Sequence, residues 1–445
     1  METALLVGVE FTDPRARRGS APGGREPEAS LAELRELAQS AGARVAGSLI
    51  QRRPRPESAT LLGAGKVEEL AALARGLDLV IFDCELTPTQ QRNLERAVGA
   101  RVLARTQLIL DIFAGHARTR EGQLQVELAQ LEYLLPRLAG RGVAMSRLGG
   151  GIGTRGPGET QLETDRRRIH HRIRGVRQAL EQVRRQRGEQ RRQRESVPLT
   201  TVALVGYTNA GKSTLFNRLT GAGVLTSQRM FATLDPTIRA LRLPSKRTVL
   251  LSDTVGFVHD LPHGLISAFR ATLEEVTRAS LLLVVADAQA PDREEHERQV
   301  QRVLLELGVE GTPRVRVWNK SDLLGPGSAA SQPGASEGDG APLLVSARTG
   351  EGLEALIARL ERELPLEAME EVRLRLPHTA GRTLHLLHER GEVLAERHRA
   401  RWVELSARVP ESLLREVEPY RKDRNPANAI RRPTARGRSK RVEKG

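Results

Sequence analysis

Residues 201–214 read Thr-Val-Ala-Leu-Val-Gly-Tyr-Thr-Asn-Ala-Gly-Lys-Ser-Thr. An apolar segment typical of a buried strand runs directly into a Gly-x-x-x-x-Gly-Lys-Ser pattern, the spacing of a phosphate-binding loop. In such a loop, backbone N–H groups and the positive end of the following helix face phosphate oxygens. Lys212 is placed to reach the β- and γ-phosphates, and Ser213 to bind Mg²⁺. The stretch predicts an α/β fold with a mostly parallel, doubly wound sheet. Its predicted nucleotide contacts are Gly206, Tyr207, Thr208, Asn209, Ala210, Gly211, Lys212, Ser213 and Thr214.

Three shorter motifs follow, each at the end of a predicted strand. The aspartate of Asp253-Thr-Val-Gly256 can hold magnesium through water, and the glycine can donate its N–H to a γ-phosphate. In Asn319-Lys-Ser-Asp322, the aspartate can accept the N1–H and the exocyclic amine of guanine, donors that adenine lacks at those places. Ser346-Ala347 would supply an N–H to the guanine oxygen. In this order the motifs predict a GTPase. They add the contacts Asp253, Thr254, Val255, Gly256, Asn319, Lys320, Asp322, Ser346, Ala347 and Arg348.

The candidate switch I lies between the first two motifs and reads Phe-Ala-Thr-Leu-Asp-Pro-Thr at residues 231–237. We expect Thr233 to complete the magnesium shell in the triphosphate state and to release on hydrolysis. Thr237 is the alternative. The predicted metal ligands are therefore Ser213 and Thr233. Further nucleotide contacts are expected from Phe231, Ala232, Thr233, Leu234 and Asp235.

The residue after Asp-Thr-Val-Gly is Phe257, where many GTPases place a glutamine that orients the attacking water. A phenyl ring can neither donate nor accept this hydrogen bond. The sequence therefore indicates no certain catalytic side chain. It predicts slow intrinsic hydrolysis of GTP, which becomes faster when a partner orders the site. The alternative is that another side chain of this chain has taken over the role.

The charge of the chain is concentrated in two segments. Its 445 residues carry a formal net charge of +15, of which residues 137–194 contribute +11 and residues 421–445 contribute +8. The rest of the chain is thus mildly acidic. Codon bias can explain an arginine-rich composition but not this clustering, whereas a polyanionic partner can. The single cysteine, Cys84, excludes a disulfide framework and a thiolate zinc cluster.

Apolar periodicity and composition divide the chain into four domains and a tail. We expect an N-terminal α/β domain at residues 1–115, a helical arm at 116–196, the GTPase domain at 197–366, a small α+β domain at 367–420 and a basic disordered tail at 421–445. A Gly/Ser/Ala/Pro-rich stretch at 325–342 predicts a disordered insertion in the GTPase domain.

The arm is predicted to be an antiparallel helical pair. Apolar residues recur at alternating spacings of four and three over 124–138, and similarly over 162–183. Thr160 and Glu163 predict a capping box at the start of the second helix. The glycine-rich loop 140–158 connects the helices, with a disordered spacer as the alternative. The predicted RNA contacts are Arg141, Arg147, Gly149, Gly150, Gly151, Arg155, Arg166, Arg167 and Arg168.

These motifs resemble those of the HflX family, GTPases of the Obg-like branch of translational GTPases. The most specific match is residues 149–167, GGGIGTRGPGETQLETDRR, and residues 85–95, 109–113 and 123–130 resemble the family's N-terminal stretches. The resemblance implies GTP and GDP as ligands, Mg²⁺ as cofactor, and binding to ribosomal RNA of the large ribosomal subunit with splitting of stalled ribosomes under stress. It also implies a hydrophobic residue at the position of Phe257 and K⁺ coordination near Asn209.

Two other classes of function stay open. An RNA-remodelling, helicase-like enzyme acting on ribosomal RNA would need a second nucleotide site, but Gly63-Ala-Gly65-Lys66 lacks the upstream glycine and the Ser/Thr and predicts only a turn before a helix. A membrane regulator would anchor through the basic tail, which has no apolar face. The longest aliphatic run, 281–286, is far short of the ~20 residues of a membrane span, and residues 1–10 contain no basic leader. We therefore expect a cytoplasmic monomer that associates with ribosomes.

Overall fold

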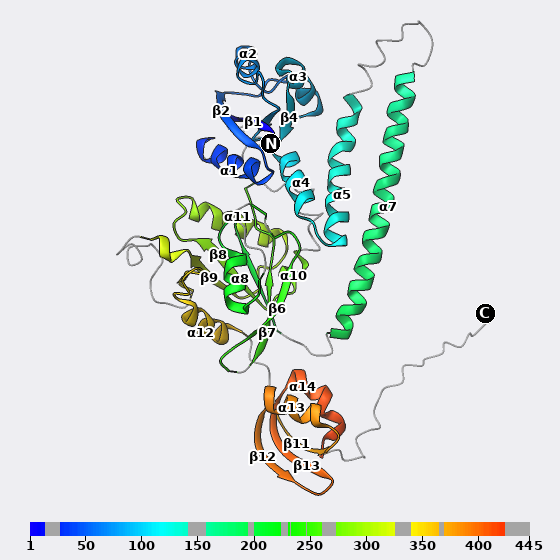
Figure 1. The fold of residues 1–445 in the computed structure, drawn as a ribbon, viewed down its shortest axis with the longest axis vertical. Coiled ribbons are helices and arrows are strands. Elements are labelled where there is room, and N and C mark those ends of the chain that lie inside the picture. Colours follow the sequence, from blue (N-terminus) through cyan, green and yellow to red (C-terminus); the bar gives the residue numbers. More distant parts are fainter. Residues whose placement is uncertain are drawn as a thin grey trace, which may run out of the picture. The chain divides into compact units, whose positions relative to one another are not determined.

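The computed structural model describes residues 1–13, 27–140, 157–194, 200–223, 230–231, 233–245, 247–259, 273–324, 340–364 and 369–422 (Figure 1). Contacts group the chain into two compact units, Met1–Pro365 and Leu366–Gly445. None of the helices among the described residues combines the length and the apolar character that crossing a bilayer needs.

The first unit begins with a parallel four-stranded sheet of order β2-β1-β3-β4. Its strands are β1 (Thr3–Phe11), β2 (Arg44–Arg53), β3 (Leu79–Phe82) and β4 (Arg101–Ala104), and its helices are α1 (Pro27–Ser40), α2 (Ala64–Leu73), α3 (Pro88–Val98) and α4 (Arg105–His116). Alternate residues of β3 point to opposite faces: Ile81 packs with α1 and α4, whereas Val80 and Phe82 pack with α2 and α3. As predicted, Gly63 directly precedes a helix, α2. On that helix Lys66 forms an ion pair with Glu69.

The arm consists of α5 (Arg120–Leu134), the short 3-10 helix η2 (Leu135–Gly140) and α7 (Pro157–Arg194). Figure 1 shows α5 and α7 side by side and antiparallel, as the apolar spacing predicted. Leu124, Val176 and Leu180 form the buried seam between the two helices. The predicted capping box is wrong, because α7 begins at Pro157 and therefore already contains Thr160.

The predicted GTPase domain of the first unit contains a six-stranded sheet of order β10-β9-β8-β5-β7-β6, in which only β6 runs antiparallel to its neighbour. The strands are β5 (Thr201–Gly206), β6 (Thr237–Arg242), β7 (Thr248–Asp253), β8 (Leu281–Asp287), β9 (Arg314–Asn319) and β10 (Leu343–Leu344). The helices are α8 (Lys212–Thr220), α10 (Glu274–Thr277), α11 (Arg293–Glu306), η4 (Ser321–Leu323) and α12 (Leu353–Glu363).

Helices cover both faces of this sheet, which confirms the predicted doubly wound fold. On β5, Val202 and Leu204 pack with α8 and α12, whereas Ala203 and Val205 join a cluster that includes α10 and α11. The same cluster contains Leu34 of α1 and Phe113 of α4, so the two sheets of this unit share one apolar core. The parallel strands place the predicted motifs at one edge of the sheet, since each motif follows a carboxyl end.

The second unit contains an antiparallel sheet of order β11-β13-β12. Its elements are β11 (Met369–Pro377), α13 (Gly381–Arg390), β12 (Glu392–His398), β13 (Trp402–Pro410), α14 (Glu411–Val417) and the 3-10 helix η5 (Glu418–Tyr420). The predicted α+β class is confirmed, but the sequence reading missed α14, whose Leu413 and Val417 complete the core of this unit. Most of the predicted tail and of the insertion at 325–342 lies outside the described residues.

Candidate nucleotide-binding site

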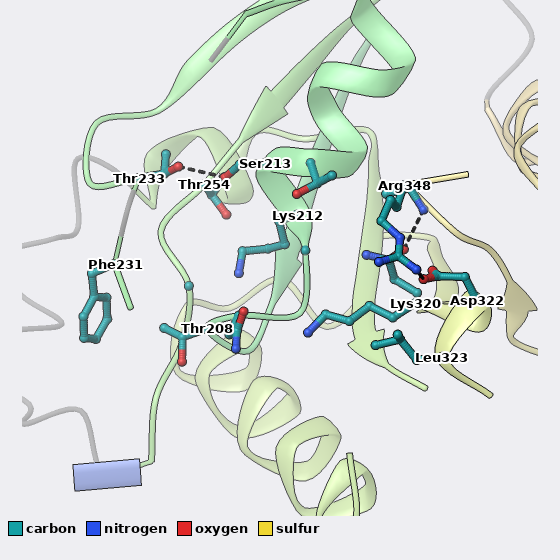
Figure 2. Close-up of a pocket in the computed structure, with 16 residues that line it drawn as sticks. Thr208, Lys212, Ser213, Phe231, Thr233, Thr254, Lys320, Asp322, Leu323 and Arg348 are labelled. Atoms are coloured by element: carbon teal, nitrogen blue, oxygen red, sulfur yellow. Dashed lines mark hydrogen bonds and ion pairs between the residues drawn. The ribbon is translucent and has the colours of Figure 1, made fainter. Parts of the chain in front are cut away.

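A cavity of about 380 Å³ lies at the carboxyl edge of the six-stranded sheet (Figure 2). Figure 2 shows Ser213 and Thr233 at one end, Asp322 and Arg348 at the other, and Lys212 between them. Its lining consists of Thr208, Asn209, Gly211, Lys212, Ser213, Thr214, Phe231, Thr233, Thr254, Gly256, Asn319, Lys320, Asp322, Leu323, Ala347 and Arg348. All but Leu323 were predicted. Leu323 directly follows Asp322, the aspartate predicted to read guanine, and that adjacency was the available signal.

The phosphate-binding loop is held by close contacts between its backbone and buried side chains. Gly211 has φ 87° and precedes α8, and a Cβ at this residue would lie 2.3 Å from Nδ2 of Asn319, so only glycine fits. Nζ of Lys212 donates to the carbonyls of Gly206 and Tyr207 at 3.1 and 2.8 Å. Burial lowers the pKa of Lys212 to about 8, against the opposing effect of Asp253. The loop thus presents a buried amine group whose charged form phosphate oxygens would stabilise. Asn209 lines the cavity, and its predicted contact with K⁺ stays a prediction.

Three oxygen-bearing side chains converge at the phosphate end. Oγ of Ser213 donates to Oδ2 of Asp253 at 2.7 Å and lies 2.9 Å from Oγ1 of Thr233, which is 3.1 Å from the same carboxylate oxygen. Oδ1 of Asp253 is buried without a hydrogen-bond partner among the described residues, and burial raises the pKa of this carboxyl group. Hard oxygen ligands with an unsatisfied acceptor suit Mg²⁺, which would neutralise phosphate charge there. The geometry favours Thr233; Thr237 instead begins β6.

The base end is organised around Asn319, which is 2% exposed. Its Nδ2 donates to the carbonyl of Ala210 and its Oδ1 accepts the N–H of Ala347, both at 2.9 Å. One side chain thereby joins the phosphate-binding loop to the predicted base-reading loop. Asp322 accepts the hydroxyl of Ser346 at 2.6 Å and pairs with Arg348. Lys320 pairs with Asp287 at 2.7 Å.

Several predicted contacts lie outside the cavity lining. Leu234 and Val255 are buried in the shared apolar core, because their side chains point away from the sheet edge. Tyr207 stacks on His296 with ring centroids 3.7 Å apart, and its hydroxyl accepts the N–H of His259. Four other predicted contacts do not line the cavity but form hydrogen bonds with residues that do: Gly206, Ala210, Asp253 and Ser346. Ala232 lies outside the described residues.

Asp235 is the clearest departure from the sequence prediction. We expected it among the nucleotide contacts, but its carboxylate accepts the backbone N–H groups of Arg118 and Thr119 at 2.9 and 2.8 Å. It therefore binds the start of the arm helix α5. Three successive residues of this segment therefore face different surroundings: Thr233 lines the cavity, Leu234 is buried in the core, and Asp235 binds the start of α5.

Phe257 is 1% exposed and lies in the shared apolar core. Its backbone N–H donates to the carbonyl of Gly206 at 3.1 Å, and its carbonyl accepts the N–H of Thr208 at 2.7 Å. The residue therefore supports the phosphate-binding loop with its backbone, while its ring is turned away from the cavity. This agrees with the expectation that Phe257 does not orient water.

The predicted RNA contacts divide between described and undescribed parts of the arm. Arg141, Arg147, Gly149, Gly150, Gly151 and Arg155 lie outside the described residues. Arg166, Arg167 and Arg168 are exposed on α7. Arg167 and Arg168 have local ion pairs with Glu163 and Asp165 at 3.5 and 3.7 Å, which are weak at such exposure.

Comparisons with known proteins cover nearly the whole chain. Family models match as "GTP-binding GTPase N-terminal" at residues 28–114, "GTP-binding GTPase Middle Region" at 116–194 and "50S ribosome-binding GTPase" at 201–320. The chain is 49% identical to the GTPase HflX of Caldanaerobacter subterraneus subsp. tengcongensis, over 86% of this chain and 88% of that protein. It is 43% identical to the GTPase HflX of Escherichia coli, over 86% and 87%.

A crystal structure of a GTP-binding protein from Sulfolobus solfataricus in complex with GDP is also similar, at 24% identity and a TM-score of 0.43, covering 82% of this chain and 99% of that one. The identities to the two HflX GTPases, over most of each chain, agree with the phosphate-binding loop, the predicted guanine-reading motifs and the arm. The chain belongs to the HflX family of GTPases and is a GTP hydrolase.

Proposed function

We propose that this GTPase binds the large ribosomal subunit in its GTP state, splits stalled ribosomes under stress, and is released on hydrolysis. The observation that carries the proposal is the arginine-rich exposed surface of α7 in the same unit as the GTP site. Arg166 and Arg174 on this helix are exposed and form no ion pair with any side chain that the structure describes. Unpaired guanidinium groups on a rigid helix suit phosphate oxygens of RNA.

The family model for residues 201–320 is described as a 50S ribosome-binding GTPase, which supports the choice of this subunit as the RNA-containing partner. The burial of Phe257 supports slow hydrolysis by the free protein, because the usual water-orienting amide is missing and the ring cannot replace it. Ribosomal subunits would then stimulate turnover by ordering the site. The protein would act as a monomer in the cytoplasm, with Mg²⁺ as cofactor.

The test combines two measurements. GTP turnover is measured with and without purified large subunits, and intact ribosomes are sedimented after incubation with the protein and GTP or GDP. We expect stimulation by large subunits and GTP-dependent appearance of free subunits. Unchanged turnover together with intact ribosomes would contradict the proposal.

A charge-reversal variant tests the arm. Arg166→Glu combined with Arg174→Glu should weaken subunit binding and lower the slope of log affinity against log salt by roughly two, since about one counterion is released for each phosphate contact. Arg302→Glu, at an exposed arginine of α11, is the matched control and should bind like the wild type. GTP affinity measured in parallel separates lost RNA binding from a damaged nucleotide site. Equal binding by both variants would show that α7 is not the RNA surface.

A further inference from the structure

Switch I is physically joined to the first helix of the arm. The carboxylate of Asp235 accepts the backbone N–H groups of Arg118 and Thr119, and Oδ1 also accepts the hydroxyl of Thr119. Thr119 is the N-cap of α5, and its Oγ1 in turn accepts the N–H of Gly122 at 3.1 Å. A negative charge at this end of α5 is also favourable for the helix dipole. One carboxylate of the GTPase domain therefore completes the cap of an arm helix.

The segment that contains Asp235 also contains Thr233, the predicted metal ligand. Two residues before Asp235, Oγ1 of Thr233 lies 2.9 Å from Ser213 and 3.1 Å from Asp253. Leu234 between them is 1% exposed in the shared core, so the segment is held on both sides of a buried anchor. Any movement that withdraws Thr233 from the phosphate end must act against the hydrogen bonds of Asp235.

The segment has two further contacts with the N-terminal elements. The backbone N–H of Met230 donates to Oγ of Ser40 at 2.8 Å, and Phe231 packs edge-on against Phe113 of α4 with centroids 4.5 Å apart. These contacts hold the beginning of the described segment, whereas Asp235 holds its end.

We propose that Asp235 is a positioning residue for Thr233, and that its bond to the cap of α5 links the nucleotide state to the arm. Because Thr233 is needed only when a γ-phosphate is present, the link favours the GTP state over the GDP state. By thermodynamic reciprocity, a partner that orders the start of α5 would raise GTP affinity by the same factor. The inference rests on GTP binding and is independent of what the arm binds.

Gly122 provides a sharp test, because it allows the close approach of Asp235. A Cβ at Gly122 would lie 2.6 Å from Oδ1 of Asp235, so Gly122→Ala must displace the carboxylate from its bonds. Alanine is also the better helix former. Its Cβ would lie 3.3 Å from Oγ1 of Thr119, a close contact that a shift of a few tenths of an ångström relieves. Gly175→Ala is the matched control, since a Cβ at that glycine of α7 meets nothing within 4 Å.

Affinities for GDP and for a nonhydrolysable GTP analogue are measured by fluorescence for Gly122→Ala, Asp235→Asn and Gly175→Ala. We expect Gly122→Ala and Asp235→Asn to bind the analogue roughly tenfold more weakly, because each loses hydrogen bonds to a charged group. Their affinity for GDP should be unchanged. The control should match the wild type for both ligands. Amide exchange at Gly122 should be slower with the analogue than with GDP in the wild type, and this difference should disappear in Asp235→Asn.

Two outcomes would overturn the proposal. Equal losses of GDP and analogue affinity would show a general structural role for Asp235, and wild-type affinities in both variants would show that Thr233 is positioned without it. If Asp235→Asn does not fold, as judged by circular dichroism, Gly122→Ala still decides between these outcomes. Ribosome binding is not part of the assay, so its result is separate from that of the proposed ribosomal function.

Discussion

The guanidinium of Arg348 lies 2.5 Å from Oδ2 of Asp322, the carboxylate predicted to read guanine. The other oxygen of this carboxylate already accepts the hydroxyl of Ser346. A guanidinium presents N–H donors much as the N1–H and exocyclic amine of guanine do. Arg348 and the base therefore compete for the same acceptor. The Arg348 side chain is 71% exposed, so the ion pair contributes little stability and opens readily.

Removing this competitor should speed nucleotide entry. We expect Arg348→Ala to raise the association rate of GDP by about two- to fivefold, the equivalent of an exposed ion pair of up to about 1 kcal/mol. Stopped-flow fluorescence with a labelled GDP measures the rate, and Arg302→Ala serves as the control. Slower association in the variant would mean that Arg348 helps to capture the base.

The amide of Asn319 should be important for both stability and binding. Asn319→Ala leaves the carbonyl of Ala210 and the N–H of Ala347 without their partner in a buried site. At about 1–3 kcal/mol for an unsatisfied buried group, we expect the free energy of unfolding to fall by about 2–3 kcal/mol and GDP affinity to fall as well. Urea denaturation and fluorescence titration measure the two effects. An unchanged GDP affinity would show that the two loops keep their positions without Asn319.

Phe257 offers a test of the missing glutamine. Because the ring is buried among apolar side chains, Phe257→Gln should place an amide in the core and not beside the γ-phosphate. We expect a loss of about 3 kcal/mol in the free energy of unfolding and no increase in GTP turnover. Thermal denaturation and phosphate release are the measurements. A variant with faster turnover would indicate that the side chain can reach the nucleotide.

A buried ion cluster should contribute strongly to stability. Arg105 lies 2.6 Å from Asp83 and 2.7 Å from Glu33, and all three side chains are buried. Arg105→Ala would leave two carboxylates without their cation, so we expect a loss of about 3–5 kcal/mol in the free energy of unfolding. Arg96→Ala, at an exposed arginine of α3, should change stability by less than about 0.5 kcal/mol. Similar values for the two variants would contradict a structural role for the cluster.

Local sequence patterns were sufficient to predict much of the fold. The apolar run 201–205 predicted a buried strand, and β5 is covered on both faces. The apolar spacing over 124–138 and 162–183 predicted the antiparallel pair α5 and α7. The nucleotide cavity was also predictable, because each motif directly follows a strand and parallel strands bring their carboxyl ends to one edge. The start of α7 was predicted wrongly, since a Thr-x-x-Glu pair is compatible with a helix interior as well as with a cap.

The sequence by itself determined the doubly wound fold, the residues that line the cavity apart from Leu323, and the family. These features depend on the spacing of residues along the chain, because the geometry of a helix or strand fixes where residues at a given spacing lie. Only the tertiary structure decided that Asp235 binds Thr119, the N-cap residue of α5, and that Arg105 joins Glu33 to Asp83. In both cases the partners are far apart in sequence. Tertiary packing makes both pairings: it brings α1, the end of β3 and the start of α4 together around Arg105, and it brings Asp235 to the start of α5.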